Sequence, residues 1–202
     1  PDSLATIIFS SGSTGEPKGV MLSHFSVDSN TQGATQILHL YQDERVLGIL
    51  PFFHSFGYMV FWFVMSNNAP MIFHPSPLDV AAIGELIRKY RITFLVTTPT
   101  FLQLYSRRCT PEQFSSVRVI LTGAEKLPKA VAEGFEARFG KKVFEGYGLT
   151  ETSPASNLNL PDPDPEGDVA GSVAMPSYRF GSVGQLLPGM AVRITDPETD
   201  EQ

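Results

Sequence analysis

A single cysteine, Cys109, occurs among the 202 residues of the chain. One cysteine rules out an internal disulfide framework and a zinc cluster built on several cysteines, and it suits a reducing compartment. His24, His39 and His74 show none of the spacings of metal ligands. The longest strongly apolar run covers residues 56–65, about half of what a membrane-spanning helix needs. We therefore expect this run to form a buried helix or the wall of a pocket.

Charged residues make up only 18% of the chain, and basic ones are the minority. The 15 lysines and arginines are outnumbered by 21 acidic residues, which gives a net charge of −6. The excess lies in residues 161–202, where eight acidic side chains stand against two basic ones. A nucleic-acid partner would require a clustered basic surface, so none is expected. No signal peptide is visible, and the first residues have the character of the middle of a protein.

With 42% hydrophobic residues, the chain is large enough for one well-packed domain. Strands are predicted at residues 46–50, 71–73, 93–96, 117–121 and 143–144, and helices at 56–65, 78–90, 101–107 and after Pro128. This alternation predicts an α/β fold with a largely parallel sheet flanked by helices on both faces. We expect the core to cover residues 1–155. An acidic loop and the truncated start of a β-rich subdomain are expected at residues 156–202.

Residues 10–19 form the most informative segment, Ser-Ser-Gly-Ser-Thr-Gly-Glu-Pro-Lys-Gly, directly after an apolar run at residues 4–9. Glycines let backbone N–H groups approach an anion, hydroxyl groups donate hydrogen bonds, and Lys18 supplies a point charge. The segment therefore predicts a phosphate-binding loop after a strand. It is not a Walker A loop, because Pro17 stands where that motif requires glycine. The alternative is a flexible linker, which the apolar residues 20–22 argue against.

Polar and glycine-rich segments leave the carboxyl ends of the predicted parallel strands. They are Pro51-Phe52-Phe53-His54, Thr97-Thr98-Pro99-Thr100, Thr122-Gly123-Ala124-Glu125 and Gly146-Tyr147-Gly148-Leu149-Thr150-Glu151. Because the ligand of such a sheet lies beyond these ends, we expect the four segments to meet at one rim.

Within these segments, four side chains are candidates for a chemical role. Glu151 beside Thr150 is suited to Mg²⁺, which takes one or two carboxylates and leaves its other positions to water and phosphate oxygens. The alternative is a solvated loop glutamate. Tyr147 would stack on a base or pack as a core aromatic residue, and His54 would gate a pocket or lie buried in the core.

The loop at residues 10–19 and the segment Glu145-Gly146-Tyr147-Gly148-Leu149-Thr150-Glu151 resemble two signature motifs of the adenylate-forming enzymes. This superfamily includes acyl-CoA synthetases, the adenylation domains of peptide synthetases and firefly luciferase. Pro51-Phe52-Phe53-His54-Ser55-Phe56-Gly57 and Thr122-Gly123-Ala124-Glu125-Lys126-Leu127 look like intermediate motifs of the family. His54 to Gly57, Pro75 to Leu78 and Gly123 to Leu127 are most similar to one branch, the acyl-acyl carrier protein synthetase domains of bifunctional 2-acylglycerophosphoethanolamine acyltransferases.

The resemblance implies a two-step reaction. A carboxylate attacks the α-phosphorus of MgATP and releases pyrophosphate, and the acyl-adenylate then acylates a thiol of coenzyme A or of a carrier protein's phosphopantetheine. Its implied catalytic residues are Lys18, Thr150, Glu151 as the Mg²⁺ ligand, and His54 between the acyl pocket and the thiol entry. Its implied nucleotide contacts are Ser10, Ser11, Gly12, Ser13, Thr14, Gly15, Lys18, Gly123, Ala124, Glu125, Glu145, Gly146, Tyr147, Gly148 and Thr150.

Two features of the family do not occur before Gln202: the ribose-binding aspartate of a Tyr-x-Thr-Gly-Asp type segment and the lysine of the small C-terminal domain. We therefore expect the chain to be a central fragment of the enzyme's large domain, with little or no ligase activity alone.

The preferred expectation for the parent enzyme is an ATP-dependent ligase of medium- or long-chain fatty acids. The alternatives are an aryl-acid or other carboxylate–CoA ligase and, in another class, a non-catalytic nucleotide- or lipid-binding module. Expected partners are the fatty acid, an acyl carrier protein or coenzyme A, and a fused or associated acyltransferase. The expected location is the cytoplasm or, through parts of the enzyme outside these residues, the periphery of the inner membrane.

Overall fold

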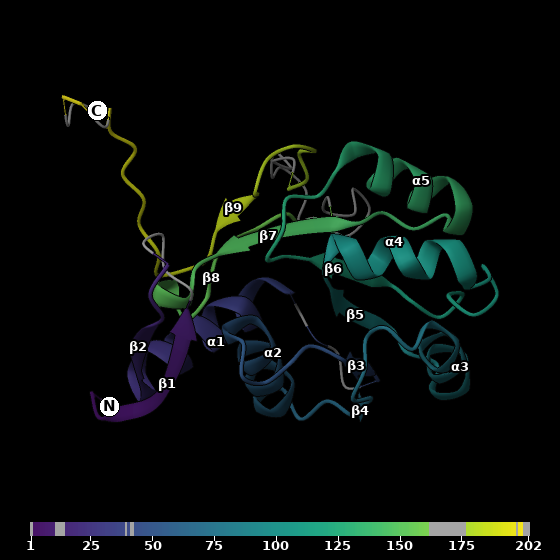
Figure 1. Cartoon of the computed structure of the whole chain (residues 1–202), viewed down its shortest axis with the longest axis horizontal. Helices are drawn as coiled ribbons and strands as arrows, with labels where there is room; N and C mark the ends of the chain where they lie inside the picture. Colours follow the sequence, from purple (N-terminus) through teal and green to yellow (C-terminus); the bar gives the residue numbers. More distant parts are fainter. Residues whose placement is uncertain are drawn as a thin grey trace, which may run out of the picture.

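The computed structural model describes residues 2–10, 15–38, 40, 43–161, 177–196 and 198–199, and their arrangement is shown in Figure 1. The predicted alternation of strands and helices is confirmed from residue 46 onwards. In chain order the elements are β3 (Val46–Gly48), α2 (Ser55–Ser66), β4 (Met71–Phe73), α3 (Val80–Tyr90), β5 (Phe94–Thr97), α4 (Pro99–Arg108), β6 (Val119–Thr122), α5 (Lys129–Phe139) and β7 (Phe144–Gly148).

The five strands are parallel neighbours in the order β4-β3-β5-β6-β7. The chain runs from β3 outward to β4, then crosses back to β5, so the switch point of the topology lies between β3 and β5. β8 (Ala155–Leu158) and β9 (Gln185–Leu186) extend the sheet in antiparallel fashion beyond β7. The expected fold class is therefore confirmed. The expected division after residue 155 stays a prediction, and β8 and β9 hydrogen-bond into the same sheet as the core.

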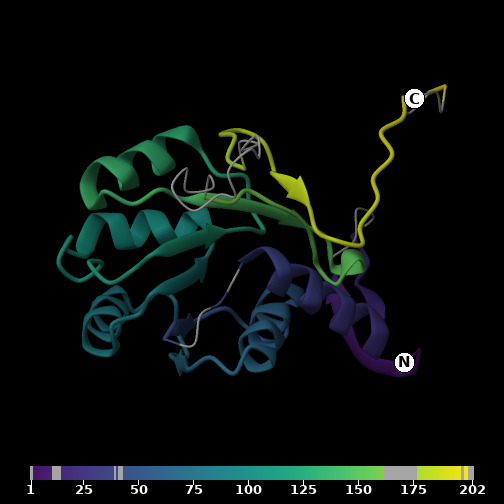
Figure 2. The same ribbon diagram turned by 180° about the vertical axis from the view of Figure 1, so that it is seen from behind.

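Helices cover both faces of this sheet (Figures 1 and 2). The helices α3, α4 and α5 enclose one core, where Ile83, Leu102 and Phe135 are fully buried. On the other face, α1 (His24–Leu38) and α2 enclose a second core that includes Phe63 and Phe94. Every residue of β5 and β6 is buried, because parallel strands have helices on both sides. No helix in the described ranges is both long and apolar enough to cross a membrane.

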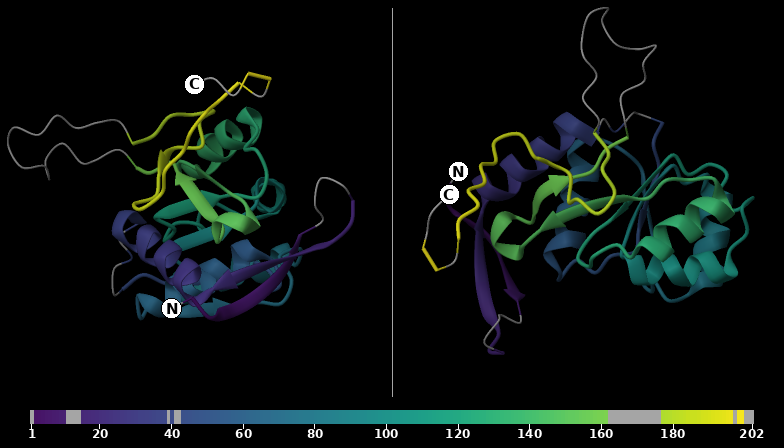
Figure 3. Two further views of the ribbon diagram at one scale, coloured as in Figure 1. Left: turned by 90° about the vertical axis from the view of Figure 1, so that its left-hand side faces the viewer. Right: turned by 90° about the horizontal axis from the view of Figure 1, so that it is seen from above.

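The first part of the chain forms a separate antiparallel hairpin of β1 (Leu4–Ser10) and β2 (Lys18–Ser23), seen in both views of Figure 3. Ser10 lies opposite Lys18 in its register. The predicted strand before the phosphate-binding loop is confirmed, but Ser10, Lys18 and Gly19, which were expected in the loop, lie in β1 and β2. Residues 11–14 of the loop lie outside the described residues. Helix α1, which follows β2 directly, was not predicted from the sequence.

Candidate active site

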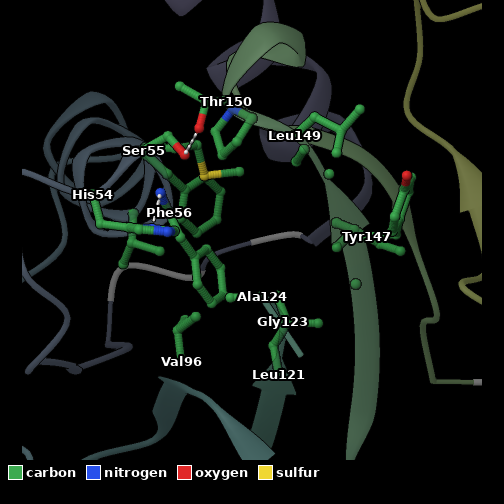
Figure 4. Close-up of a pocket in the computed structure, with 18 of the residues that line it drawn as sticks. His54, Ser55, Phe56, Val96, Leu121, Gly123, Ala124, Tyr147, Leu149 and Thr150 are labelled. Carbon is green, nitrogen blue, oxygen red and sulfur yellow. Dashed lines mark hydrogen bonds between the residues drawn. The ribbon is translucent and has the colours of Figure 1, made fainter. Parts of the chain in front are cut away.

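A cavity of about 450 Å³ opens at the carboxyl edge of the parallel strands, within the range of small-molecule sites. Figure 4 shows the side chains that line it. The lining residues come mainly from α2, β5, β6, β7 and the turn after β7, with further ones from β1, α1 and β8. Three of the four segments expected at this rim contribute lining residues. The fourth, which follows β5, reaches the same rim through a hydrogen bond from the Thr100 hydroxyl to Glu125 Oε2 at 2.6 Å.

The floor of the cavity is apolar. Met59, Val60 and Phe63 lie at helical spacing on the buried face of α2 and point toward the sheet. Phe94 and Val96 of β5 close the opposite side, and the ring centroids of Phe63 and Phe94 are 6.2 Å apart. The expectation that residues 56–65 form a buried helix and a pocket wall is confirmed for this face. The floor can accept only a part of a ligand that needs no hydrogen bonds.

Glycines bring backbone close to backbone at the rim. A Cβ atom on Gly148 would lie 1.9 Å from the carbonyl oxygen of Pro154, so only glycine allows the chain to double back there. A Cβ atom on Gly123 would lie 3.0 Å from Cζ of Phe56. The Phe56 ring thus packs directly on the strand end that carries Gly123, between the floor and the rim (Figure 4).

Two hydrogen bonds fix the polar groups at the start of α2. The hydroxyl groups of Ser55 and Thr150 lie 3.3 Å apart and join α2 to the turn after β7. The N–H of Phe56 donates to Nδ1 of His54 at 3.2 Å, so His54 caps α2. Because Nδ1 accepts this bond, a neutral His54 ring carries its proton on Nε2, which leaves an N–H donor for a ligand at the mouth of the cavity.

The turn after β7 presents Glu151 to solvent. It contains a short 3₁₀ helix, Thr150–Thr152, and is held from within by the Thr152 hydroxyl, which accepts from the N–H of Leu149 at 3.0 Å and donates to the carbonyl of Pro154. Glu151 is exposed and supplies the one carboxylate among the described residues that line the cavity.

A profile of the AMP-binding enzyme family matches residues 1–202. The chain belongs to this family. Probable 4-coumarate–CoA ligase 1 from Dictyostelium discoideum is 36% identical over 203 residues, which cover 98% of this chain and 34% of the relative. The 4-coumarate–CoA ligase from Pinus taeda is 32% identical and is matched over 37% of its length, by 100% of this chain.

Solved structures agree with the family. ATP-bound MatB from Rhodopseudomonas palustris has a TM-score of 0.83 and 32% identity, over 99% of this chain and 37% of MatB. The O-succinylbenzoate coenzyme A synthetase MenE from Bacillus subtilis, in complex with AMP, has a TM-score of 0.70 and 26% identity, over 78% of this chain and 32% of MenE. The chain thus spans about a third of the length of the relatives that it matches.

The residues of the candidate site fit a divalent cation only in part. The described residues include no group of three or more histidine, cysteine, aspartate or glutamate side chains that could hold a metal ion. One carboxylate, Glu151, and one nearby hydroxyl group, Thr150, suit Mg²⁺, whose other positions go to water and to the phosphate oxygens of a substrate.

The structure brings most of the predicted site residues together. Those that line the cavity are Ser10, His54, Gly123, Ala124, Gly146, Tyr147, Gly148, Thr150 and Glu151. Gly15, Lys18 and Glu125 are exposed outside the lining, and Glu145 is buried below it, where Oε1 accepts the N–H of Leu127 at 3.0 Å. Ser11, Gly12, Ser13 and Thr14 lie outside the described residues.

Sequence reasoning missed three kinds of residue in this candidate site. It did not name Phe94 and Val96, although the alternation of side chains along a strand puts every second residue on one face. It gave Ser55 no role beside Thr150. It also missed Asn30, which reaches the Glu151 turn from α1, and no local signal in the sequence marks that contact.

Proposed function

We propose that the protein containing this chain is an ATP-dependent acid–thiol ligase that forms an acyl-adenylate. The observation that carries the proposal is a single cavity in which an apolar floor meets a polar rim with Thr150 and Glu151. The similarity to MatB with bound ATP and to MenE with bound AMP supports a nucleotide at the rim. In the first step a carboxylate oxygen attacks the α-phosphorus and pyrophosphate leaves. In the second, a thiol sulfur attacks the carbonyl carbon, its proton is lost, and AMP leaves.

The residues at the rim are suited to phosphate chemistry. Lys18 and the loop at residues 10–15 would contact the β- and γ-phosphates, and Thr150 would donate to a phosphate oxygen. Glu151 would hold Mg²⁺, which neutralises developing charge on the phosphates when bound. Gly123 and Gly146 line the cavity at the strand ends, and the base of the nucleotide would lie beside them, where Tyr147, which is 48% exposed, could stack on it. His54 would contact the incoming thiol group.

The floor supports an acid with a compact apolar body. Phe63 and Phe94 are fully buried and close the cavity, which favours an aryl acid or a medium-chain fatty acid over a long chain. The relatives named as 4-coumarate–CoA ligases agree with this choice. We test it by ATP–pyrophosphate exchange of the full-length protein with 4-coumarate, octanoate, palmitate or no acid. Exchange with palmitate alone would overturn the compact acid, and no exchange with any acid would favour a non-catalytic binding module.

Coenzyme A is the first candidate for the thiol acceptor, since the relatives are named as CoA ligases. A carrier protein, with a fused or associated acyltransferase, is the second candidate. It is supported only by the resemblance of residues 54–57, 75–78 and 123–127 to the acyl-acyl carrier protein synthetase branch. Incubation of the acyl-adenylate with each thiol separates them: thioester formation on a holo-carrier protein but not on coenzyme A would reverse this order.

We also propose that residues 1–202 alone turn over little acid, because they span about a third of the relatives. Acyl-adenylate formation by the isolated chain at the rate of the full-length protein would contradict this.

A further inference from the structure

The side-chain amide of Asn30 forms hydrogen bonds to a turn that is distant in the sequence. It lies on α1 and is 3% exposed. Its Nδ2 group donates to the carbonyl of Thr152 at 3.1 Å and to the carbonyl of Ala155 at 2.6 Å, and its Oδ1 accepts the N–H of Ala155 at 3.3 Å. Both N–H bonds of the amide and one acceptor site are thus used on a segment more than 120 residues further along the chain.

The turn needs this support because of its backbone. Ser153 has φ of +73°, in the left-handed region that residues other than glycine rarely adopt. The three bonds of Asn30 attach on both sides of Ser153, to Thr152 before it and to Ala155 after it. The internal bonds of the Thr152 hydroxyl close the turn on itself but do not fix it relative to the rest of the molecule. The paired strands β7 and β8 hold its two ends in the sheet, and Asn30 from α1 and the weaker contact of Ser55 with Thr150 from α2 fix it from outside the sheet.

The N-terminal end of α1, six residues before Asn30, follows the hairpin of β1 and β2. The helix starts directly after β2, the strand that begins at Lys18. The Ser23 hydroxyl caps it by accepting the N–H of Ser26 at 3.1 Å. A 15-residue helix therefore connects the strand with Lys18 to the turn with Glu151. Two segments that are 133 positions apart in the sequence, from residue 18 to residue 151, are held by one rigid element.

We propose that Asn30 is a positioning residue that sets the Thr150–Glu151 turn at a fixed place relative to the Lys18 strand. Through Glu151 it determines how well the site holds Mg²⁺ with the nucleotide phosphates. This inference rests on the proposed function, since it assigns Glu151 to the cation. Partners that orient a metal-binding carboxylate typically change metal affinity or activity by about 10- to 100-fold when they are removed.

The test compares Asn30→Ala with Thr31→Val in the full-length protein. Thr31 is the next residue of α1, is 2% exposed, and its hydroxyl bonds only the carbonyl of Val27 within the helix, at 2.8 Å. Thr31→Val therefore removes a buried hydrogen bond from the same helix without touching the turn. Asn30→Asp is a second variant of native shape, which keeps the acceptor for the N–H of Ala155 and loses both donors.

The readouts are amide hydrogen exchange of residues 149–155 without ligand, and the Mg²⁺ concentration that half-saturates ATP binding measured by calorimetry. We expect exchange in this segment to accelerate about 10-fold and the Mg²⁺ requirement to rise about 10-fold in the Asn30 variants, with native values in Thr31→Val. If Asn30→Ala does not fold, Asn30→Asp carries the same expectation. Equal Mg²⁺ requirement in the Asn30 and Thr31 variants would overturn the inference. Pyrophosphate exchange by the unaltered protein is measured alongside, and its absence would contradict the proposed function instead.

Discussion

At the scale of single residues, Gly148 shows how tightly the candidate site is built. A Cβ atom there would lie 1.9 Å from the backbone of Pro154, which cannot rotate aside, so Gly148→Ala must displace the turn that carries Glu151. We expect a loss of about 1–3 kcal/mol in the free energy of unfolding, measured with urea. Gly134→Ala in α5 is the control, since nothing lies within 4 Å of its Cβ position, and it should gain about 0.5–1 kcal/mol. Equal stability of the two variants would contradict this picture of the turn.

Cys109 makes the stability depend on pH at the alkaline end. Burial raises the pKa of its thiol from 9.0 to about 11, against a smaller opposing effect of Arg138. Burial also raises the pKa of Tyr105. Because both groups lose their protons more readily in the unfolded chain, their contribution is fully present below about pH 9 and falls as the pH rises. For Cys109 alone, the free energy of unfolding has fallen by about 2 kcal/mol at pH 11.

Urea unfolding of the unaltered chain and of Cys109→Ala between pH 8 and pH 11 measures that loss. The variant is expected to be less stable at pH 8, because a buried side chain is shortened, but to lose less stability as the pH rises. Parallel curves for the two proteins would show that the thiol does not titrate differently in the folded and unfolded states.

Several site residues could be predicted one by one, because their residue type and their position in the sequence together indicate a chemical role. Glu151 beside Thr150, and glycines after strands, suggest phosphate and cation chemistry before any fold is known. Their meeting at one rim follows from the parallel order of the strands. Asn30 could not be predicted, because its role depends on a contact between α1 and a turn 122 residues away. Lys18 is exposed in β2 and lies outside the cavity lining, so its contact with phosphate also stays a prediction.

At the scale of elements, apolar periodicity explains which helices the sequence reveals. Helix α3 buries Val80, Ile83 and Ile87 at helical spacing and was predicted. Helix α1 was missed because it buries mostly small or polar side chains; its buried residues are Asn30, Thr31, Gly33, Ala34 and Leu38. Such a helix packs by close approach, and a Cβ atom on Gly33 would lie 3.1 Å from the carbonyl oxygen of Pro188. The contact that holds the Glu151 turn is thus made by a helix whose sequence shows little apolar periodicity.

Helix α2 combines a structural and a proposed chemical role at its first turn, and the two can be separated. His54 caps the helix through Nδ1, and asparagine can cap a helix equally well. We expect His54→Ala to lose about 0.5–2 kcal/mol of stability and His54→Asn to lose little. Both variants should retain pyrophosphate exchange but form thioester more slowly, since the Nε2–H donor at the cavity mouth is gone. Native thioester formation by His54→Asn would exclude His54 from the second step.

At the scale of the whole molecule, the two edges of the parallel sheet have different roles. The cavity lies at the carboxyl edge, whereas Glu44, Thr93 and Arg118 precede β3, β5 and β6 at the amino edge. The side chain of Glu44 is only 4% exposed, and it accepts from Arg118 at 2.5 Å and from the Thr93 hydroxyl. This ion pair joins the starts of three strands, so it should stabilise the sheet without affecting the site.

Arg118→Met tests whether the ion pair at the amino edge stabilises the sheet without affecting the site. The substitution removes the guanidinium group and leaves the buried Glu44 carboxylate without it. We expect the free energy of unfolding to fall by about 1–3 kcal/mol, a loss that is moderated by the 43% exposure of Arg118. Adding Glu44→Gln removes the unpaired charge, so the double variant should recover part of the loss, with a coupling of about 1–2 kcal/mol in a double-mutant cycle. The Mg²⁺ requirement for ATP binding should stay native in all three variants, because no residue of the pair lines the cavity. A changed requirement in a variant that is still folded would mean that strain at the amino edge reaches the Glu151 turn through the strands.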